Sequence, residues 1–360
     1  MNADLQPSLT RRYLGQMRRE IMNFTRLARF FCVLLPGTAL PALCDAADPG
    51  SELASFSVFD KVDLAELAKS DAKTMHGPPM GGRYLSVQSC YIMPGDPARQ
   101  LQAMRQWDPT SHRELKVYVH GDLPASPAPS HFAKLKNAPN NGPVNAFVSA
   151  TQKLGPELQI SREEAKKAPT GDSTGGGTIP NSVVTFWSDL LANRAKLFMS
   201  GGTAAQPSYD HAANVRPNEE LRALLKQQGK IQHQFNDFLS GTGIGRGAGS
   251  LPAEPYWELL NVDDQGVVTL GASYSRGGAG GAQTADVLYY ASGGYYVALT
   301  LHQMWPVTVE GKTSTLIWRG DMISSAALES LHGVERLASE GAMVKDISKS
   351  IALFRRQGSR

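Results

Sequence analysis

Five strand-like segments follow one another near the end of the chain, and this run limits the fold more than any other feature. Short turns rich in glycine or aspartate separate each segment from the next. Connections of this kind join antiparallel neighbours, so the run predicts a β-meander. The predicted strands cover residues 256–262, 267–274, 285–290, 295–304 and 313–318.

Two further strands and two helices complete the predicted core. Strands are expected at Tyr84–Met93 and Leu115–His120, and Asp96-Pro97 starts a helix between them. Ala326–Phe354 carries one apolar stripe, which predicts a closing helix roughly 40 Å long. The sequence therefore predicts an α+β fold, in which an antiparallel sheet of about six or seven strands packs against a long C-terminal helix.

The alternation along the strand at 295–304 predicts which side chains face the core. Tyr295, Val297, Leu299 and Leu301 are expected to point inward, and Ala298, Thr300 and His302 outward.

An irregular stretch separates the second predicted strand from the meander. Residues 121–250 are rich in proline, glycine and asparagine, and their apolar periodicity predicts helices at 144–154, 182–199, 217–228 and 231–239. We interpret this stretch as an irregular and helical insertion into one domain at 47–360, because about 310 residues suffice for one large core.

The first residues have the order of an export signal. Arg26 and Arg29 precede the apolar run 30–35, and small residues follow at Cys44 and Ala46. We interpret residues 1–46 as a signal peptide with an upstream extension, with translation starting at Met22 and cleavage after Ala46. The mature chain is then expected in the periplasm or outside the cell, without a transmembrane helix. The pair Arg18–Arg19 leaves the twin-arginine route open as an alternative.

Charge and cysteine content exclude several classes of protein. The chain has 36 Lys+Arg and 33 Asp+Glu, and residues 1–46 hold six of the former and three of the latter, so 30 of each remain. A neutral chain lacks the positive field that nucleic-acid binding uses. Only Cys90 remains after residue 46, so an internal disulfide is excluded; its apolar surroundings predict a buried, unreactive thiol.

The short motifs in this chain predict no catalytic or metal site. Residues 243–248 match G-x-G-x-x-A, but a helix is expected before them and Pro252 follows, which favours a linker over a dinucleotide loop. Arg319-Gly320-Asp321 is an adhesion-type tripeptide that occurs commonly by chance. The eight histidines lack helical zinc spacing and G-x-S-x-G is absent, so we predict no metal and no cofactor, and catalytic residues stay unknown.

Aromatic residues give the most suggestive pattern, because many of them fall on the meander. They can line a groove for an apolar or planar ligand, or they can simply form the edges of a core. The residues predicted to bind a ligand are Trp257, Tyr290, Tyr295, Leu299 and Trp318.

The order of elements at 83–120 and 255–356 resembles the helix-grip fold of START-like lipid-transfer and polyketide-cyclase-type proteins. The resemblance rests on element order alone, and the roughly 130 residues between the second strand and the meander depart from it. It implies a curved sheet around the last helix, with an apolar ligand between them.

Three functions remain open. The first is non-enzymatic binding of an apolar or amphipathic small molecule or lipid between the sheet and the C-terminal helix. The second is an enzyme with an acid–base site at the cavity mouth, to which His302 or Arg319 would contribute. The third is a structural or interaction protein of the cell envelope; it predicts an exposed apolar stripe on the helices at 181–239, including Phe186, Trp187 and Leu190.

Overall fold

The computed structural model describes residues 48–169, 179–278 and 280–358. The predicted signal segment lies outside these residues. Within them, no helix combines the length and the apolar character that crossing a bilayer requires.

One eight-stranded antiparallel sheet forms the centre of the molecule. Its strands lie in the order β1-β2-β8-β7-β6-β5-β4-β3. The meander β4–β8 is therefore extended by β3 at one edge and by β2 and β1 at the other. The strands are β1 (Lys73–His76), β2 (Tyr84–Pro94), β3 (Val117–Asp122), β4 (Glu254–Val262), β5 (Gln265–Gly278), β6 (Gly281–Ala291), β7 (Val297–Val309) and β8 (Lys312–Ser324).

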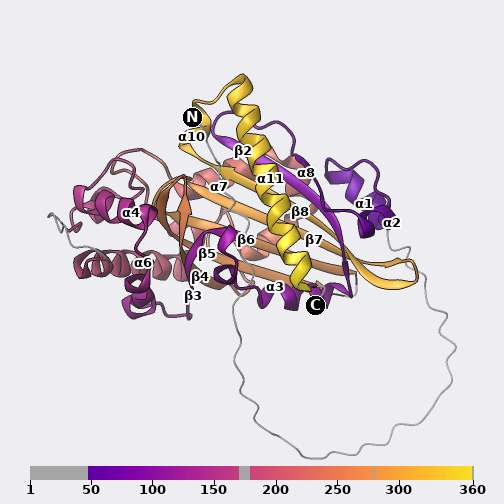
Figure 1. The fold of residues 1–360 in the computed structure, drawn as a ribbon, viewed down its shortest axis with the longest axis horizontal. Helices are drawn as coiled ribbons and strands as arrows, with labels where there is room; N and C mark the ends of the chain where they lie inside the picture. The colour runs from indigo at the N-terminus through magenta and orange to yellow at the C-terminus, as the bar shows by residue number, and fades with distance from the viewer. Residues whose placement is uncertain (1–47, 170–178, 279, 359–360) are drawn as a thin grey trace, which may run out of the picture.

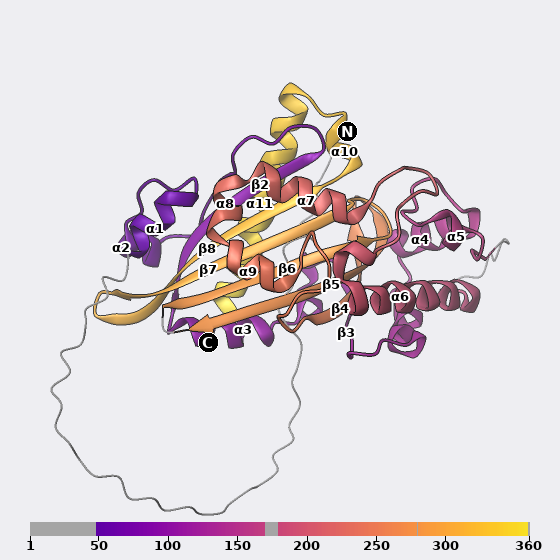
Figure 2. The same cartoon turned by 180° about the vertical axis from the view of Figure 1, so that it is seen from behind.

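Helices cover both faces of the sheet. The long helix α11 runs diagonally across one face, with α3 near its C-terminal end (Figure 1). Helices α7, α8 and α9 cross the opposite face, and α4 and α6 lie beyond the β3–β4 side (Figure 2). The described helices are α1 (Pro49–Phe56), α2 (Leu64–Lys69), α3 (Pro97–Arg105), η2 (Pro109–Ser111), η3 (Arg113–Leu115), η4 (Pro129–Asn137), α4 (Gly142–Lys153), α5 (Arg162–Ala165), α6 (Asn181–Gly201), η5 (Gly202–Ala205), α7 (Pro217–Gln227), α8 (Gly229–Gln234), α9 (Asn236–Thr242), α10 (Ala326–Glu329) and α11 (Gly333–Gly358).

Two tight turns set the register of the meander. Asp263 and Asp264 join β4 to β5, and both have positive φ angles, 47° and 60°. Glu310 and Gly311 join β7 to β8 in the same way, with φ angles of 49° and 74°. Positive φ at both central residues is the requirement of a type I′ turn, whose twist matches that of the strands it joins.

Polar side chains cap the starts of several helices, including the start that the sequence predicts at Asp96. The Asp96 carboxylate accepts a hydrogen bond from the Arg99 backbone N–H at 2.8 Å and begins α3. Asn141 caps α4 in the same manner, at 3.0 Å from the Val144 N–H. Each cap satisfies a backbone donor that the first helical turn leaves unpaired.

The structure confirms the predicted α+β class and the helix packed on the sheet, with one strand more than expected. Strand β1 was not predicted, because its four residues are mostly exposed and show no apolar alternation. The predicted closing helix is two helices, α10 and α11, which separate where Gly333 takes a φ of 52°. Helix 231–239 is likewise divided, into α8 and α9.

The expected outward orientation of Ala298, Thr300 and His302 is wrong in one respect. These side chains do alternate with those of Val297 and Leu299, but they are also buried. The reason is the second helical layer: α11 and α3 pack on the face that the sequence pattern assigns to solvent (Figure 1). In this strand, alternation of polar and apolar residues therefore does not predict which face is exposed to solvent.

Candidate functional site

A row of buried polar side chains crosses the sheet on the face that α11 covers. We call this row the polar belt. Its flanking neighbours on the same face, Ile317 and Ile323 on β8, pack in one apolar cluster with Met343 and Ile347 of α11. Every belt residue except His120 is at most 5 % exposed. The belt consists of Ser89 (β2), Arg319 and Asp321 (β8), Thr300 and His302 (β7), Thr284 and Asp286 (β6), Ser273 (β5), Tyr256 and Glu258 (β4), and His120 (β3).

An ion pair occupies the β8 part of the belt. Arg319 donates from Nε to Asp321 Oδ2 at 2.8 Å and from Nη2 to Oδ1 at 3.0 Å. Thr300 also donates to Oδ1, at 2.8 Å. Burial raises the pKa of the Asp321 carboxyl above its ordinary value, although Arg319 and Thr300 oppose this shift. The pair is thus held by three hydrogen bonds inside the protein.

His302 lies directly beside Arg319, because the β7–β8 register pairs the two residues. Its Nδ1 is 3.0 Å from the hydroxyl of Thr284 on the next strand. Burial lowers the pKa of His302 well below its ordinary value, and the Arg319 charge lowers it further. The imidazole is therefore neutral at neutral pH.

Carboxylates continue the belt toward β3. Asp286 accepts hydrogen bonds from the Tyr256 hydroxyl at 2.6 Å and from the Ser273 hydroxyl at 2.5 Å. Further along, Glu258 Oε1 lies 3.0 Å from Nδ1 of His120. The belt thus offers a cation, three carboxylates, two imidazoles and several hydroxyls on one surface, the side-chain types that acid–base chemistry and polar recognition use.

Arg319 also borders a small cavity under α3 and α11. The cavity has a volume of about 10 Å³, room for one water molecule. Its wall is apolar apart from Arg319 and Ser350, and is formed by Tyr91, Met104, Trp107, Arg319, Ser350, Ile351 and Phe354.

The five residues predicted to bind a ligand lie on two faces. Tyr295 belongs to the apolar cluster on the α11 face. Trp257, Tyr290, Leu299 and Trp318 belong to the core on the opposite face. There the Trp318 ring packs edge-on against Phe56 at 4.9 Å, and its Nε1 donates to Gln88 Oε1 at 3.1 Å. A ligand between the sheet and α11 would meet only Tyr295 of the five, and a binding role for the others stays a prediction.

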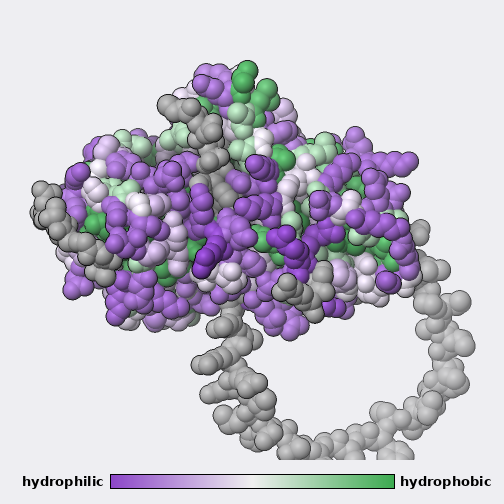
Figure 3. Space-filling view, in the orientation of Figure 1, coloured by the Kyte–Doolittle hydropathy of each residue, from purple (hydrophilic) through white to green (hydrophobic). Residues whose placement is uncertain are grey.

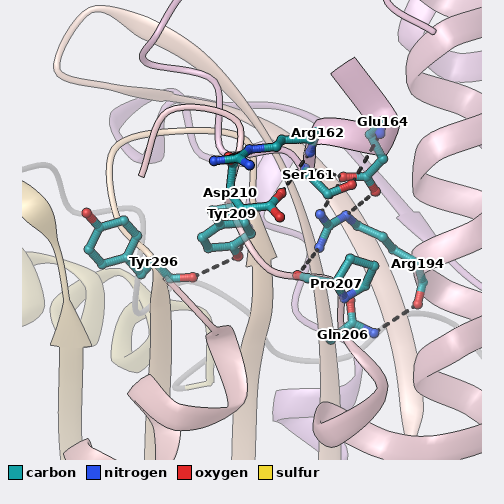
Figure 4. Close-up of polar contacts among 10 residues, drawn as sticks. Ser161, Arg162, Glu164, Arg194, Gln206, Pro207, Tyr209, Asp210 and Tyr296 are labelled. Atoms are coloured by element: carbon teal, nitrogen blue, oxygen red, sulfur yellow. Dashed lines mark hydrogen bonds and ion pairs between the residues drawn. The ribbon is translucent and has the colours of Figure 1, made fainter. Parts of the chain in front are cut away.

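Tyr290 contacts a second buried ion pair, which Arg194 forms with Glu164. Arg194 on α6 donates to both carboxylate oxygens of Glu164, at 2.7 Å and 2.6 Å, and to the Pro207 carbonyl at 3.1 Å (Figure 4). Its guanidinium lies 4.3 Å from the Tyr290 ring centre. Burial alone would lower the pKa of Arg194, but attraction to Glu164 outweighs it and the net shift is upward. The cluster ties α5, α6 and the segment between η5 and α7 together.

Two short motifs are accounted for by local packing. Residues 243–247 follow helix α9 rather than a strand, so they lack the geometry of a dinucleotide loop. Arg319 and Asp321 of the tripeptide point into the protein, where no receptor reaches them. Among the described residues, no group of three or more His, Cys, Asp and Glu is placed to hold a metal ion.

Sequence reasoning named His302 and Arg319 but missed their partners. Asp286, Thr284 and Glu258 were not singled out, and Asp321 was named only as part of the Arg319-Gly320-Asp321 tripeptide. The polar residues of the neighbouring strand, Thr300 and His302, were expected to face outward, so no buried polar row was predicted. The usable signal is register: once a two-residue turn is placed at 310–311, pairing β7 with β8 puts His302 opposite Arg319 and Thr300 opposite Asp321.

Comparison of the chain with protein-family models, curated protein sequences and solved structures gives no match.

Proposed function

We propose that this is an exported protein that binds a small amphipathic molecule between the sheet and α11, with the polar part of that molecule on the polar belt. The belt is the observation that carries the proposal. Export follows from the sequence of residues 1–46, and the place of the ligand follows the resemblance to START-like proteins.

The belt is a costly feature for a sheet covered on both faces. Such sheets ordinarily carry apolar side chains on each side, because a buried polar group costs about 1–3 kcal/mol when its hydrogen bonds are not replaced. Here polar residues cross from β2 to β3 without interruption. Departures of this kind from the usual pattern concentrate at functional sites.

The cavity beside Arg319 supports a ligand position in the layer between sheet and helices. Arg319 offers guanidinium donors, while Ile351 and Phe354 offer apolar surface. An amphipathic molecule with a hydrogen-bond-accepting head matches both. The cavity as it stands holds one water, so binding requires the C-terminal half of α11 to move outward from β2.

Native mass spectrometry of the protein purified from its own host tests this proposal. We expect a bound mass that is retained in the wild type and lost in Ser350→Phe, because Ser350 lines the cavity and is buried. Lys349→Phe, at the exposed neighbouring position, is the matched control and should retain the mass. A wild-type protein that carries no small molecule, or equal retention in both variants, contradicts the proposal.

An acid–base enzyme is the second candidate, and His302 is the observation that favours it. A neutral imidazole next to a guanidinium and a hydroxyl can accept a proton from a bound molecule whose developing negative charge Arg319 stabilises. The co-purified molecule should then change mass on incubation with fresh wild-type protein and stay unchanged with His302→Gln. An unchanged mass with both proteins contradicts the enzyme hypothesis and is consistent with binding without catalysis.

The third function, an envelope interaction protein, loses the feature that was expected to support it. Phe186, Trp187 and Leu190 of α6 are buried rather than arranged as an exposed stripe. Exposed apolar side chains occur instead at Val334 and Leu337, near the start of α11. This end of α11 projects from the molecule in Figure 1, and hydrophobic residues are visible on the projecting part in Figure 3.

A further inference from the structure

A broad groove lies on the face of the molecule opposite α11. It runs between α7, the α8–α9 pair and the glycine-rich segment 243–247, in the region where those helices cross the sheet (Figure 2). Its volume is about 780 Å³, within the range of small-molecule sites. Its apolar lining includes Leu225, Leu239 and Ile244, which are themselves buried.

Three cations surround this apolar floor. Arg222 and Lys226 stand four residues apart on α7, one helical turn, and therefore share a face. Arg246 comes from the glycine-rich segment. Arg222 and Lys226 form no ion pair or side-chain hydrogen bond within the described parts of the chain, whereas Arg246 donates to Ser240 at 3.3 Å.

Among the described residues, one acidic side chain lines the groove. Glu219 is the acidic residue of the lining, and its carboxylate lies 3.4 Å from the guanidinium of Arg216 outside the groove. The groove therefore has a net positive charge over an apolar floor.

The polar wall is held in place by Thr203. Its hydroxyl donates to Asn218 Oδ1 at 2.7 Å and accepts from the Gly245 N–H at 3.0 Å. This leaves the N–H groups of the Asn218 amide available to another acceptor. Gly245 itself has a φ of 72°, and a Cβ there would lie 3.2 Å from Cγ of Arg222. The close approach of segment 243–247 to α7 thus depends on glycine.

We propose that this groove binds a small amphiphile whose apolar body lies on Leu225, Leu239 and Ile244 and whose oxyanion head is bound by Arg222 and Lys226. Guanidinium and ammonium groups pair with carboxylate, sulfonate and phosphate oxygens, and Arg246 and the Asn218 amide complete the donor set. The site is separate from the polar belt, because the sheet lies between them.

The fluorescent probe 8-anilinonaphthalene-1-sulfonate tests the proposal, since it joins a sulfonate to an apolar aromatic body. It is titrated into the full chain and into Arg222→Gln, Lys226→Gln and the double variant. We expect the dissociation constant to rise about threefold in each single variant and about tenfold in the double variant, the range for exposed charge pairs. Lys230→Gln, an exposed α8 cation outside the lining, is the matched control and should bind as the wild type does.

Competition between two ten-carbon molecules then tests the role of the anion. Sodium decanoate should displace the probe at a concentration at least about fivefold lower than 1-decanol, because only decanoate carries a charge for Arg222 and Lys226. Equal displacement by both, or a probe affinity that the double variant leaves unchanged, overturns the proposal. Both substituted residues are exposed, so denaturant unfolding should show unchanged stability and exclude misfolding as the cause.

Discussion

Arg319 and Asp321, two residues apart on β8, form a two-point ion pair inside the protein, with N–O distances of 2.8 Å and 3.0 Å. The residue between them is glycine for a packing reason. A Cβ on Gly320 would lie 2.4 Å from the ring of Trp318, which turns back over this position on the opposite face. The Arg-Gly-Asp tripeptide is therefore explained by buried contacts: the ion pair on one face of the sheet and the Trp318 ring on the other.

Asp321→Asn is expected to destabilise the protein by about 3–5 kcal/mol, because it removes one member of a buried pair and leaves the Arg319 charge uncompensated. Urea unfolding followed by tryptophan fluorescence measures the effect. Glu310→Gln is the control: it breaks the exposed pair with Lys69 and should leave the urea midpoint close to that of the wild type. Similar losses in the two variants would show that the buried pair contributes no more than a surface one.

His302 gives the stability of the protein a pH dependence of known sign. Its pKa in the folded state lies well below the ordinary 6.5, so below pH 6.5 the unfolded chain binds a proton that the folded chain does not. Stability contributed by the neutral imidazole is thus present above pH 6.5 and is lost as pH falls. Between pH 7.5 and 5.5 the wild type should lose about 1 kcal/mol more than His302→Gln. Unfolding curves at both pH values measure this, and parallel losses in the two proteins would contradict it.

The buried ion pair between Arg194 and Glu164 should contribute far more to stability than the exposed ion pair of the adjacent residue, Glu163. Glu164→Gln leaves a fully buried guanidinium without its counter-charge, and we expect a loss of about 3 kcal/mol or more in the free energy of unfolding. Glu163→Gln is the matched control, because Glu163 is exposed and its ion pair is with Lys166, which is also exposed. Its effect should stay within about 0.5 kcal/mol. Equal effects would mean that water reaches Arg194.

Most of the fold could be predicted from local signals, and the site only in part. Strand β2 is predicted by alternation, helix α3 by the Asp96 cap, and the meander by its tight turns. All three signals come from residues that are close together in the sequence. The second helical layer depends on α3 and α11, which are far apart in the sequence, packing on the same face of the sheet, and no local pattern predicts that face. Without it, Thr300 and His302 look solvent-facing, and their alignment with Arg319 and Asp321 becomes visible only through strand register.

The thiol of Cys90 is expected to be inert in the folded protein. It is fully buried, and burial raises its pKa to about 12, so almost no thiolate exists at pH 8. In a full-length chain carrying Cys32→Ser and Cys44→Ser, an aromatic disulfide reagent should label Cys90 at the rate of global unfolding. Labelling should become immediate in 6 M guanidinium chloride, while fast labelling under native conditions would place Cys90 in a locally opening segment.

The glycines at the β5–β6 hairpin are predictable as a turn from sequence, but their individual roles are not. Gly281 has a φ of 132°, and a Cβ there would lie 2.0 Å from the Met304 carbonyl oxygen of the adjacent strand β7. Gly281→Ala must therefore distort the β6–β7 pairing, and we expect a loss of about 2 kcal/mol or more. Gly280→Ala is the control one residue earlier, where a Cβ meets no atom within 4 Å. It should leave the free energy of unfolding within about 0.5 kcal/mol of the wild type. Because the two substitutions add the same methyl group, a larger loss in Gly280→Ala would mean that chain entropy at the turn, rather than contact with β7, selects glycine here.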